Sequence, residues 1–388
     1  MMRLKEILFA LLRCEVCGET LSEEVKKVCT SELAGSLYKF AKAHDLAHLV
    51  GDAIASSALL PKENALYQKF VQQRRTAVYR CEQLNYELER ISEVFKEKEI
   101  YHIPLKGSVL REYYPESWMR TSCDIDLFVA EEDLDKATQV LSEDLGYRVD
   151  GKSLHDIQLF SESGLHLELH FILIEENRFP QMSEILMNIR SYTQESSEGE
   201  YRLQTTVEFF YFYHIAHMVK HFVCGGCGIR PFLDLWIMER KMPCDKEKLE
   251  SLLRKGGIFT FYERAKTLSE CWFSNAEADA LALEMEDYIF CGGVYGSTEN
   301  KIAVKRENTK SKIGYLFSCI FLPYEQLAQI YPSLKGKKIL TPFYQVRRWF
   351  RILFKGVSKK TKGTLKAYDS VTEDKQERTK KLFDTLEI

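Results

Sequence analysis

The sequence lacks any long hydrophobic run. None of its apolar stretches approaches the ~20 residues that a helix needs to cross a bilayer. Near the first residue an apolar stripe is present, but Glu6 and Arg13 interrupt it before it reaches the length of a signal-peptide core. We therefore expect a protein without a transmembrane segment that works in the cytoplasm.

An excess of one charge is also missing. The 388 residues include 54 Lys and Arg against 57 Asp and Glu, which gives a formal net charge of -3. Because there is no basic excess, the composition gives no clear signal for a nucleic-acid partner. Hydrophobic residues make up 45% of the chain, which is enough for a packed core and for two or three domains.

The cysteines do not form the pattern of a disulfide-stapled protein. There are 11 of them, an odd number, and they are scattered from Cys14 to Cys319. A chain of this size does not need disulfide staples, so the distribution favours a reducing compartment. Cys14 and Cys17 lie in an amphipathic stretch without a nearby histidine, and we expect them to pack in the core.

Proline and glycine are rare inside the helical patterns that begin the chain. Residues 1–98 show apolar positions every three or four residues, which predicts helices. Short apolar runs bounded by turns follow over 99–200, helical patterns return over 201–355, and 356–388 is predicted to be a charged, partly flexible tail. The predicted fold class is α+β, a small mixed β-sheet flanked by N-terminal and C-terminal helical regions.

Two carboxylates stand inside the apolar run DIDLFV. On a strand, Asp124 and Asp126 face one way while Ile125 and Leu127 face the other. Glu168, in LHLELHF, is expected on the face opposite its flanking leucines and offers a third carboxylate. Hard oxygen ligands of this kind suit Mg²⁺ or Mn²⁺, although polar alternation on a solvated strand face would look the same.

A turn before this strand supplies groups suited to phosphate. In PLKGSVL, Gly107 would let the backbone approach a phosphate, and Ser108 offers a hydroxyl and an amide at the start of a short helix. Lys106 and Arg120 are cations near the two ends of the same segment, suited to neutralising phosphate oxygens. The sequence therefore predicts a phosphate-binding turn beside a metal site.

The order of these elements resembles the nucleotidyltransferase superfamily that includes polymerase beta and kanamycin nucleotidyltransferase. The LKG turn, an arginine four residues before DID, and a helix ending in Gly-Tyr resemble in particular the bacterial family called uncharacterised nucleotidyltransferases. This resemblance continues through HMVKHF and RPFLDL and covers roughly residues 100–239.

The resemblance implies an enzyme with a nucleotidyltransferase core over 99–200. It would move an NMP from an NTP to an acceptor hydroxyl on a small molecule, a sugar or a protein, and release pyrophosphate. Asp124, Asp126 and Glu168 would be the catalytic metal ligands, and Gly107 and Ser108 would form the glycine turn. Glu168 stands where many relatives carry Asp. Two other functions stay open: a nucleotide-binding regulatory pseudoenzyme, against which the three intact acids argue, and a toxin-like enzyme that modifies a protein.

The stretch HIAHMVKHFVCGGCGIRPFLDLW raises the question of a second metal. His217 and His221 are four apart and share one face of a predicted helix, and Cys224 and Cys227 follow it, so the four could hold zinc. The resemblance supports the histidines but not the cysteines, so we expect no zinc and expect both histidines to line the substrate cleft. Buried core histidines are the alternative.

Arg230 and Asp234 are also four apart on a predicted helix. At this spacing they could form an intrahelical ion pair or belong to the substrate cleft, and the pattern does not separate the two.

Overall fold

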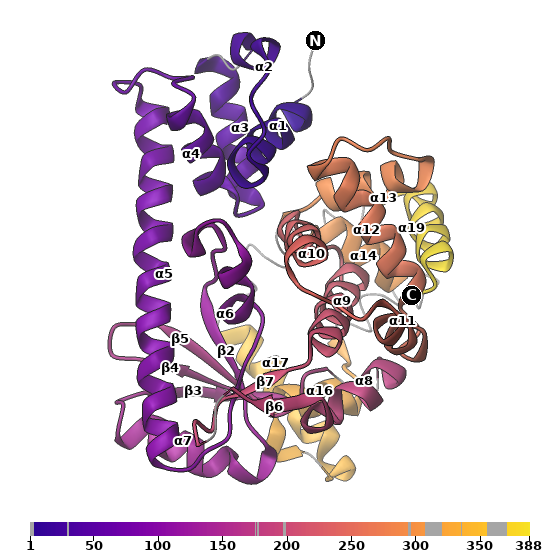
Figure 1. Cartoon of the computed structure of the whole chain (residues 1–388). Helices are drawn as coiled ribbons and strands as arrows, with labels where there is room; N and C mark the ends of the chain where they lie inside the picture. The colour runs from indigo at the N-terminus through magenta and orange to yellow at the C-terminus, as the bar shows by residue number, and fades with distance from the viewer. Residues whose placement is uncertain are drawn as a thin grey trace.

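The computed structural model describes residues 4–28, 31–174, 176, 178–196, 199–293, 296–306, 320–334, 336–354 and 371–388. Over these ranges the chain has an α+β fold, which confirms the predicted class. Along the chain, a mixed sheet follows an N-terminal helical region and precedes a second helical region; in Figure 1 the N-terminal helices lie above the sheet and the later helices lie to its right.

The N-terminal helical region ends in one long helix that reaches the sheet. Its helices are α1 (Leu4–Cys17), α2 (Glu23–Val28), α3 (Ser31–Ala43), α4 (Ala47–Ser56) and α5 (Ala65–Glu97). Helix α5 begins at the N-cap Asn64, whose side chain accepts a hydrogen bond of 2.8 Å from the backbone N–H of Leu66. Gly51 lets α4 approach α5 closely, because a Cβ at this position would lie 2.9 Å from Phe70 Cβ. Figure 1 shows α5 running from these helices down along the sheet.

The sheet contains five strands in the order β1-β2-β5-β4-β3. They are β1 (Ile103–Pro104), β2 (Asp124–Phe128), β3 (Arg148–Lys152), β4 (Asp156–Phe160) and β5 (His166–His170). The pair β2 and β5 is parallel, and the other neighbouring pairs are antiparallel. A separate two-stranded sheet is formed by β6 (Thr193–Glu195) and β7 (Leu203–Thr205).

One face of the five-stranded sheet is apolar and covered by helices. Ile125 and Leu127 of β2 and Leu167 and Leu169 of β5 are buried there, in one core cluster with residues of α5 and α7 (Leu134–Glu143). Strand residues alternate between faces, so burying this set directs the intervening polar residues to the opposite face. Burial of the apolar face therefore determines which side of the sheet carries the carboxylates.

The C-terminal helical region lies on the side of the polar face. Its first helices are α8 (Pro180–Met187), α9 (Val207–Val223), α10 (Arg230–Lys241), α11 (Lys246–Lys255), α12 (Phe259–Phe273), α13 (Ala280–Phe290) and α14 (Thr298–Arg306). The N-cap of α9 is Thr206, whose side chain accepts from the N–H of Phe209 at 3.4 Å. Most residues of α9 are buried, so it forms the centre of this region.

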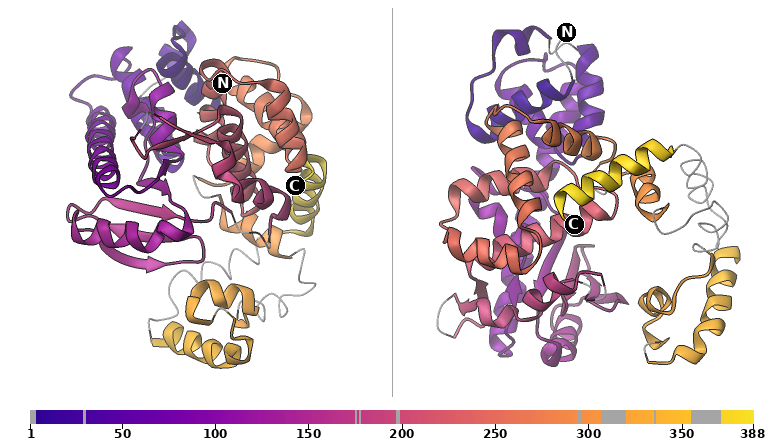
Figure 2. Two further views of the ribbon diagram at one scale, coloured as in Figure 1. Left: turned by 60° about the horizontal axis from the view of Figure 1, so that its bottom comes forward. Right: turned by 90° about the vertical axis from the view of Figure 1, so that its right-hand side faces the viewer.

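Two short helices follow the C-terminal helical region. Helices α16 (Tyr324–Ile330) and α17 (Thr341–Phe354) pack around a small core of Leu327, Tyr331 and Leu334. Figure 2 shows them as a distinct pair beyond the edge of the main body. No helix in the described ranges has both the length and the apolar content needed to cross a membrane.

The predicted charged, partly flexible tail over 356–388 ends in a helix. Residues 356–370 lie outside the described residues, but α19 (Glu373–Leu386) is a regular helix beside α12, α13 and α14 (Figure 2). Leu382, Phe383 and Leu386 are buried, and the Phe383 ring lies 5.7 Å from that of Tyr288 in α13. These few apolar residues share one helix face, which is enough to dock an otherwise charged helix.

The sheet core should be sensitive to a cavity at its centre. Leu127 is 0% exposed, so Leu127→Ala should lower the free energy of unfolding by about 2–5 kcal/mol in chemical denaturation. Val149 on β3 is 46% exposed, and Val149→Ala should cost less than about 1 kcal/mol. Equal losses in the two variants would contradict the burial pattern of this sheet.

Candidate active site

A cleft lies between the polar face of the sheet and helices α9 and α10, with a cavity volume of about 400 Å³. This volume is within the range of small-molecule sites. The sheet and the segment before it contribute the acids Asp124, Asp126, Asp156 and Glu168 together with Lys106 and Gly107. Helices α9 and α10 contribute Tyr213, His214, His217, His221, Arg230 and Asp234. The cleft is therefore lined by polar side chains from both regions.

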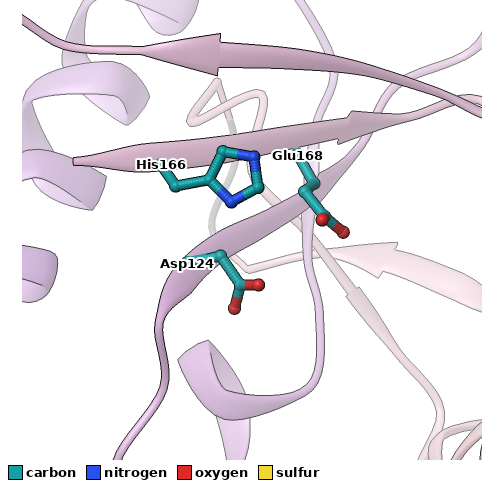
Figure 3. A group of neighbouring side chains, drawn as sticks. All are labelled: Asp124, His166 and Glu168. Carbon is teal, nitrogen blue, oxygen red and sulfur yellow. The ribbon is translucent and has the colours of Figure 1, made fainter. Parts of the chain in front are cut away.

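The parallel register of β2 and β5 brings the three predicted acids together. Asp126 lies opposite Glu168, and Asp124 lies opposite His166. Side chains at paired positions of neighbouring strands point the same way, so all of these groups share the polar face. Figure 3 shows Asp124, His166 and Glu168 around a common space. One ligand atom from each of these three lies within 4.8 Å of the others, and the same holds for Asp126, Glu168 and His170.

Asp126 is held by two cationic partners. Lys106 Nζ donates to Asp126 Oδ1 at 2.7 Å, and His170 Nε2 donates to the same oxygen at 2.9 Å. Burial alone would raise the pKa of Asp126, but Lys106 and His170 outweigh it and hold this pKa well below its usual value. Burial disfavours the charged form of Lys106, but the Asp126 carboxylate outweighs this effect and raises the pKa of the ammonium.

The other two carboxylates differ in their surroundings. Burial, followed by the charges of Asp126 and Glu168, raises the pKa of Asp124. His170 Nε2 also lies 3.4 Å from Glu168 Oε2, and this hydrogen bond lowers the pKa of Glu168. The pKa of His170 is itself raised, because these hydrogen bonds outweigh the effect of burial. The site is a cluster of acids with incomplete charge compensation, a setting in which a divalent cation would be stabilised.

The glycine turn has only part of the predicted arrangement. Lys106 adopts a φ of 46°, and the short helix α6 (Gly107–Leu110) follows it directly. Gly107 lines the cleft, whereas Ser108 is buried, is not among the lining residues, and donates its backbone N–H to the Leu105 carbonyl at 3.1 Å. The amide that we predicted for phosphate is therefore used within the turn. Arg111 holds the turn by donating to the Gly107 carbonyl at 2.8 Å.

Arg120 and Arg230 both form ion pairs that join separate parts of the fold. Arg120 was predicted to neutralise phosphate oxygens. Its Nε donates to Asp234 Oδ1 at 2.7 Å, and this ion pair links the segment before β2 to α10. Arg230 Nη1 donates to Asp45 Oδ2 at 2.5 Å and links α10 to the N-terminal helices. Tyr114 also donates to Asp234 Oδ1, at 2.7 Å. Arg230 and Asp234 thus line the cleft, and each forms an ion pair with a residue of another part of the fold.

His217 and His221 both line the cleft, and their Nε2 atoms lie 3.2 Å apart. Burial, followed by the charges of Lys106 and His221, lowers the pKa of His217 well below its usual value. Cys227 lines the cleft, but Cys224 does not. Within the described residues, the two histidines and two cysteines do not form a group with ligand atoms within 4.8 Å of one another. The expectation of no zinc here stays a prediction.

Several residues that lie on the acid-bearing face or line the cleft were missed by the sequence reasoning; His170, Asp156 and Tyr213 line the cleft, and His166 lies beside it. His166 and His170 flank Glu168 at alternate positions of HLELH, and this alternation alone would have placed them on the acid-bearing face. Asp156 begins β4 and faces the same cleft, where its Oδ1 accepts from the Ser153 hydroxyl at 2.7 Å. Tyr213 comes from α9, and no local sequence pattern distinguishes it from the neighbouring aromatic core residues.

A mixed sheet with three acids on one face, beside a glycine turn, has the arrangement expected of a nucleotidyltransferase core. The family model described as uncharacterised nucleotidyltransferase matches residues 31–274. Because this match spans more than half of the 388 residues, the chain belongs to this family, as the motifs suggested. The match runs from α3 to the end of α12 and so includes the helices on both sides of the cleft. Searches of curated proteins and of solved structures gave no match.

The buried pair of Arg120 and Asp234 should be a strong point of stability. Asp234 is 1% exposed, so Asp234→Ala leaves the Arg120 guanidinium buried without its carboxylate and should cost about 3–5 kcal/mol of unfolding free energy. Glu270→Ala removes the partner of Arg240 in a half-exposed pair and should cost at most about 1 kcal/mol. Chemical denaturation of both variants measures the two losses of unfolding free energy. A loss below about 1 kcal/mol for Asp234→Ala would show that the pair of Arg120 and Asp234 contributes no more than an exposed ion pair.

Proposed function

We propose that this protein is a metal-dependent nucleotidyltransferase that transfers an NMP from an NTP to an acceptor hydroxyl and releases pyrophosphate. One observation carries the proposal: the register of β2 and β5 gathers Asp124, Asp126 and Glu168 on one wall of the cleft. Membership of a nucleotidyltransferase family supports an NTP as the substrate. Three intact acids in a cleft of substrate size favour an enzyme over a regulatory pseudoenzyme.

The donor set fits a divalent metal ion. Asp124 and Asp126 each have a carboxylate oxygen within 4.8 Å of one from Glu168, in two groups that share Glu168, and the positive charge of Lys106 compensates only part of the combined charge of the three acids. Mg²⁺ or Mn²⁺ bound there would supply Lewis-acid stabilisation of the phosphate oxygens and activation of the acceptor oxygen.

The residues of the chain have distinct roles in the proposed reaction. The acceptor oxygen forms a bond to the α-phosphorus, the bond between that phosphorus and the bridging oxygen breaks, and pyrophosphate leaves. Glu168 orients the acceptor hydroxyl or takes its proton, and Lys106 neutralises phosphate oxygens as negative charge shifts to the leaving group. Because Gly107 has no side chain, the phosphates can approach the backbone of the turn closely. Arg120 positions α10 through Asp234.

The opposite wall of the cleft is the proposed acceptor side. His217 and His221 from α9, with Arg230 and Asp234 from α10, lie across from the acids. The ion pairs of Arg230 with Asp45 and of Asp234 with Arg120 hold α10 in place, so Arg230 and Asp234 shape the pocket.

We also propose a cytoplasmic location, which is supported by the free state of all described cysteines.

Removing one acid should abolish activity without unfolding the protein. Asp124→Asn should lower label transfer from NTP at least ~100-fold. Replacing a residue that only orients a metal ligand already lowers metal affinity or activity about 10–100-fold, and Asp124 is proposed to be a ligand itself. Its melting temperature without metal should be no lower than that of the wild type, because the charge of Asp124 is unfavourable beside Asp126 and Glu168. The assay incubates purified protein with each labelled NTP, Mg²⁺ or Mn²⁺ and a cell extract, and asks which fraction takes up label.

Glu131→Gln is the matched control, because Glu131 is an exposed acid outside the cleft. It should transfer label at the wild-type rate. Label in a protein fraction instead of small molecules would identify the acceptor as a protein. Label transfer at the wild-type rate by Asp124→Asn, at saturating metal, would contradict the proposed mechanism.

The glycine turn can be tested by binding alone. A Cβ at Gly107 would lie 3.2 Å from Ser122 Cβ and Oγ, so Gly107→Ala must displace either the turn that faces the phosphates or Ser122 beside it. We expect its affinity for a non-hydrolysable NTP to fall at least ~10-fold in calorimetric titration, equivalent to about 1.4 kcal/mol. Gly151→Ala is the control, since a Cβ there meets nothing within 4 Å. Unchanged affinity in Gly107→Ala would mean that the turn only connects a strand to a helix.

A further inference from the structure

His166 and His170 occupy equivalent positions on β5, two residues to either side of Glu168, yet they have different partners. His170 Nε2 donates to Asp126 Oδ1 at 2.9 Å and lies 3.4 Å from Glu168 Oε2, so its ring orients carboxylates. His166 Nε2 is buried and has no hydrogen-bond partner in the described part of the chain. A buried ring nitrogen without a partner requires an explanation, as do His170 Nδ1 and both ring nitrogens of His44, which also lack partners among the described residues.

The ring of His166 is held in a fixed position beside two acids. It stacks on Phe160 of the adjacent strand, with ring centroids 4.7 Å apart and an interplanar angle of 20°. Figure 3 shows the imidazole directed into the space that Asp124 and Glu168 also face. A nitrogen of this ring and one oxygen from each carboxylate all lie within 4.8 Å of one another. Two oxygens and one nitrogen therefore converge on a space the size of an ion.

We propose that His166 is a metal ligand together with Asp124 and Glu168, and that this site binds a transition ion such as Mn²⁺ or Co²⁺ more tightly than Mg²⁺. The inference rests on the proposed function, because the ion would be the one that the transfer reaction uses. Imidazole nitrogen suits first-row transition ions, whereas Mg²⁺ selects oxygen ligands and retains its water. The stacking partner Phe160 fixes the ring plane, and His170 acts as a positioning residue through its contacts with the carboxylates.

Pulsed electron paramagnetic resonance of the Mn²⁺-loaded protein tests the coordination directly. Manganese bound to an imidazole gives a ¹⁴N modulation, and manganese bound only by carboxylates and water gives none. We expect this modulation in the wild type, and we expect it to change to the ¹⁵N pattern when the protein is made with ¹⁵N-histidine. The wild-type measurement needs no substitution, so a folding defect in a variant cannot obscure the answer.

His166→Gln and His170→Gln form a matched pair, because they remove the same ring from the same face of the same strand. His166→Gln should lose the nitrogen signal and bind Mn²⁺ 10–100-fold more weakly in calorimetric titration, with little change for Mg²⁺. His170→Gln should keep the nitrogen signal. The wild type should bind Mn²⁺ at least ~10-fold more tightly than Mg²⁺, in line with the preference of nitrogen-containing sites.

A wild-type spectrum without nitrogen coupling, or coupling that survives in His166→Gln and vanishes in His170→Gln, would overturn the assignment. Failure of this inference can be separated from failure of the proposed function. Bound Mn²⁺ without nitrogen coupling, in protein that still transfers label from NTP, would refute only the role of His166. Absence of label transfer with every NTP and metal, in protein that shows the coupling, would refute only the reaction.

Discussion

Repulsion among three carboxylates on one sheet face is the constraint on which the site depends. Asp126 and Glu168 are paired across β2 and β5, and Asp124 lies two residues from Asp126. Burying such a group is costly unless positive charge compensates it. Lys106 and His170 supply that charge for Asp126, and the protein directs the remaining negative charge into a cleft instead of the core. The chemistry proposed for the cleft follows from this remaining charge, because a divalent ion would compensate it and would also bind the negatively charged triphosphate.

The cleft also depends on contacts between regions far apart in the sequence. Arg120 beside the sheet pairs with Asp234 of α10, and Arg230 of α10 pairs with Asp45 next to α4. These ion pairs connect the sheet, the C-terminal helices and the N-terminal helices around one cavity. The family match from 31 to 274 includes the sheet and helices from both helical regions, which is consistent with a single functional unit.

Local patterns predicted much of this arrangement, and long-range pairing supplied the rest. Alternation placed Asp124 and Asp126 on one strand face, but only the parallel pairing of β2 with β5, strands that are not consecutive in the chain, places Glu168 beside them. Helical spacing predicted the proximity of His217 and His221, because it is a property of one helix. The partner of Asp234 could not be predicted in this way, since Arg120 lies 114 residues away. The burial of Ser108 could not be predicted, because it depends on how the whole turn packs.

The central claim is that the acids of β2 and the glycine turn bind the metal and the triphosphate of one NTP. A crystal structure with Mn²⁺ and a non-hydrolysable NTP, with manganese located by its anomalous scattering, tests it most directly. The account predicts manganese within about 2.5 Å of a carboxylate oxygen of Asp124 and of at least one more of the acids Asp126 and Glu168, with the phosphates between this ion and the turn at Gly107. A nucleotide bound elsewhere, or manganese bound away from these acids, would contradict it.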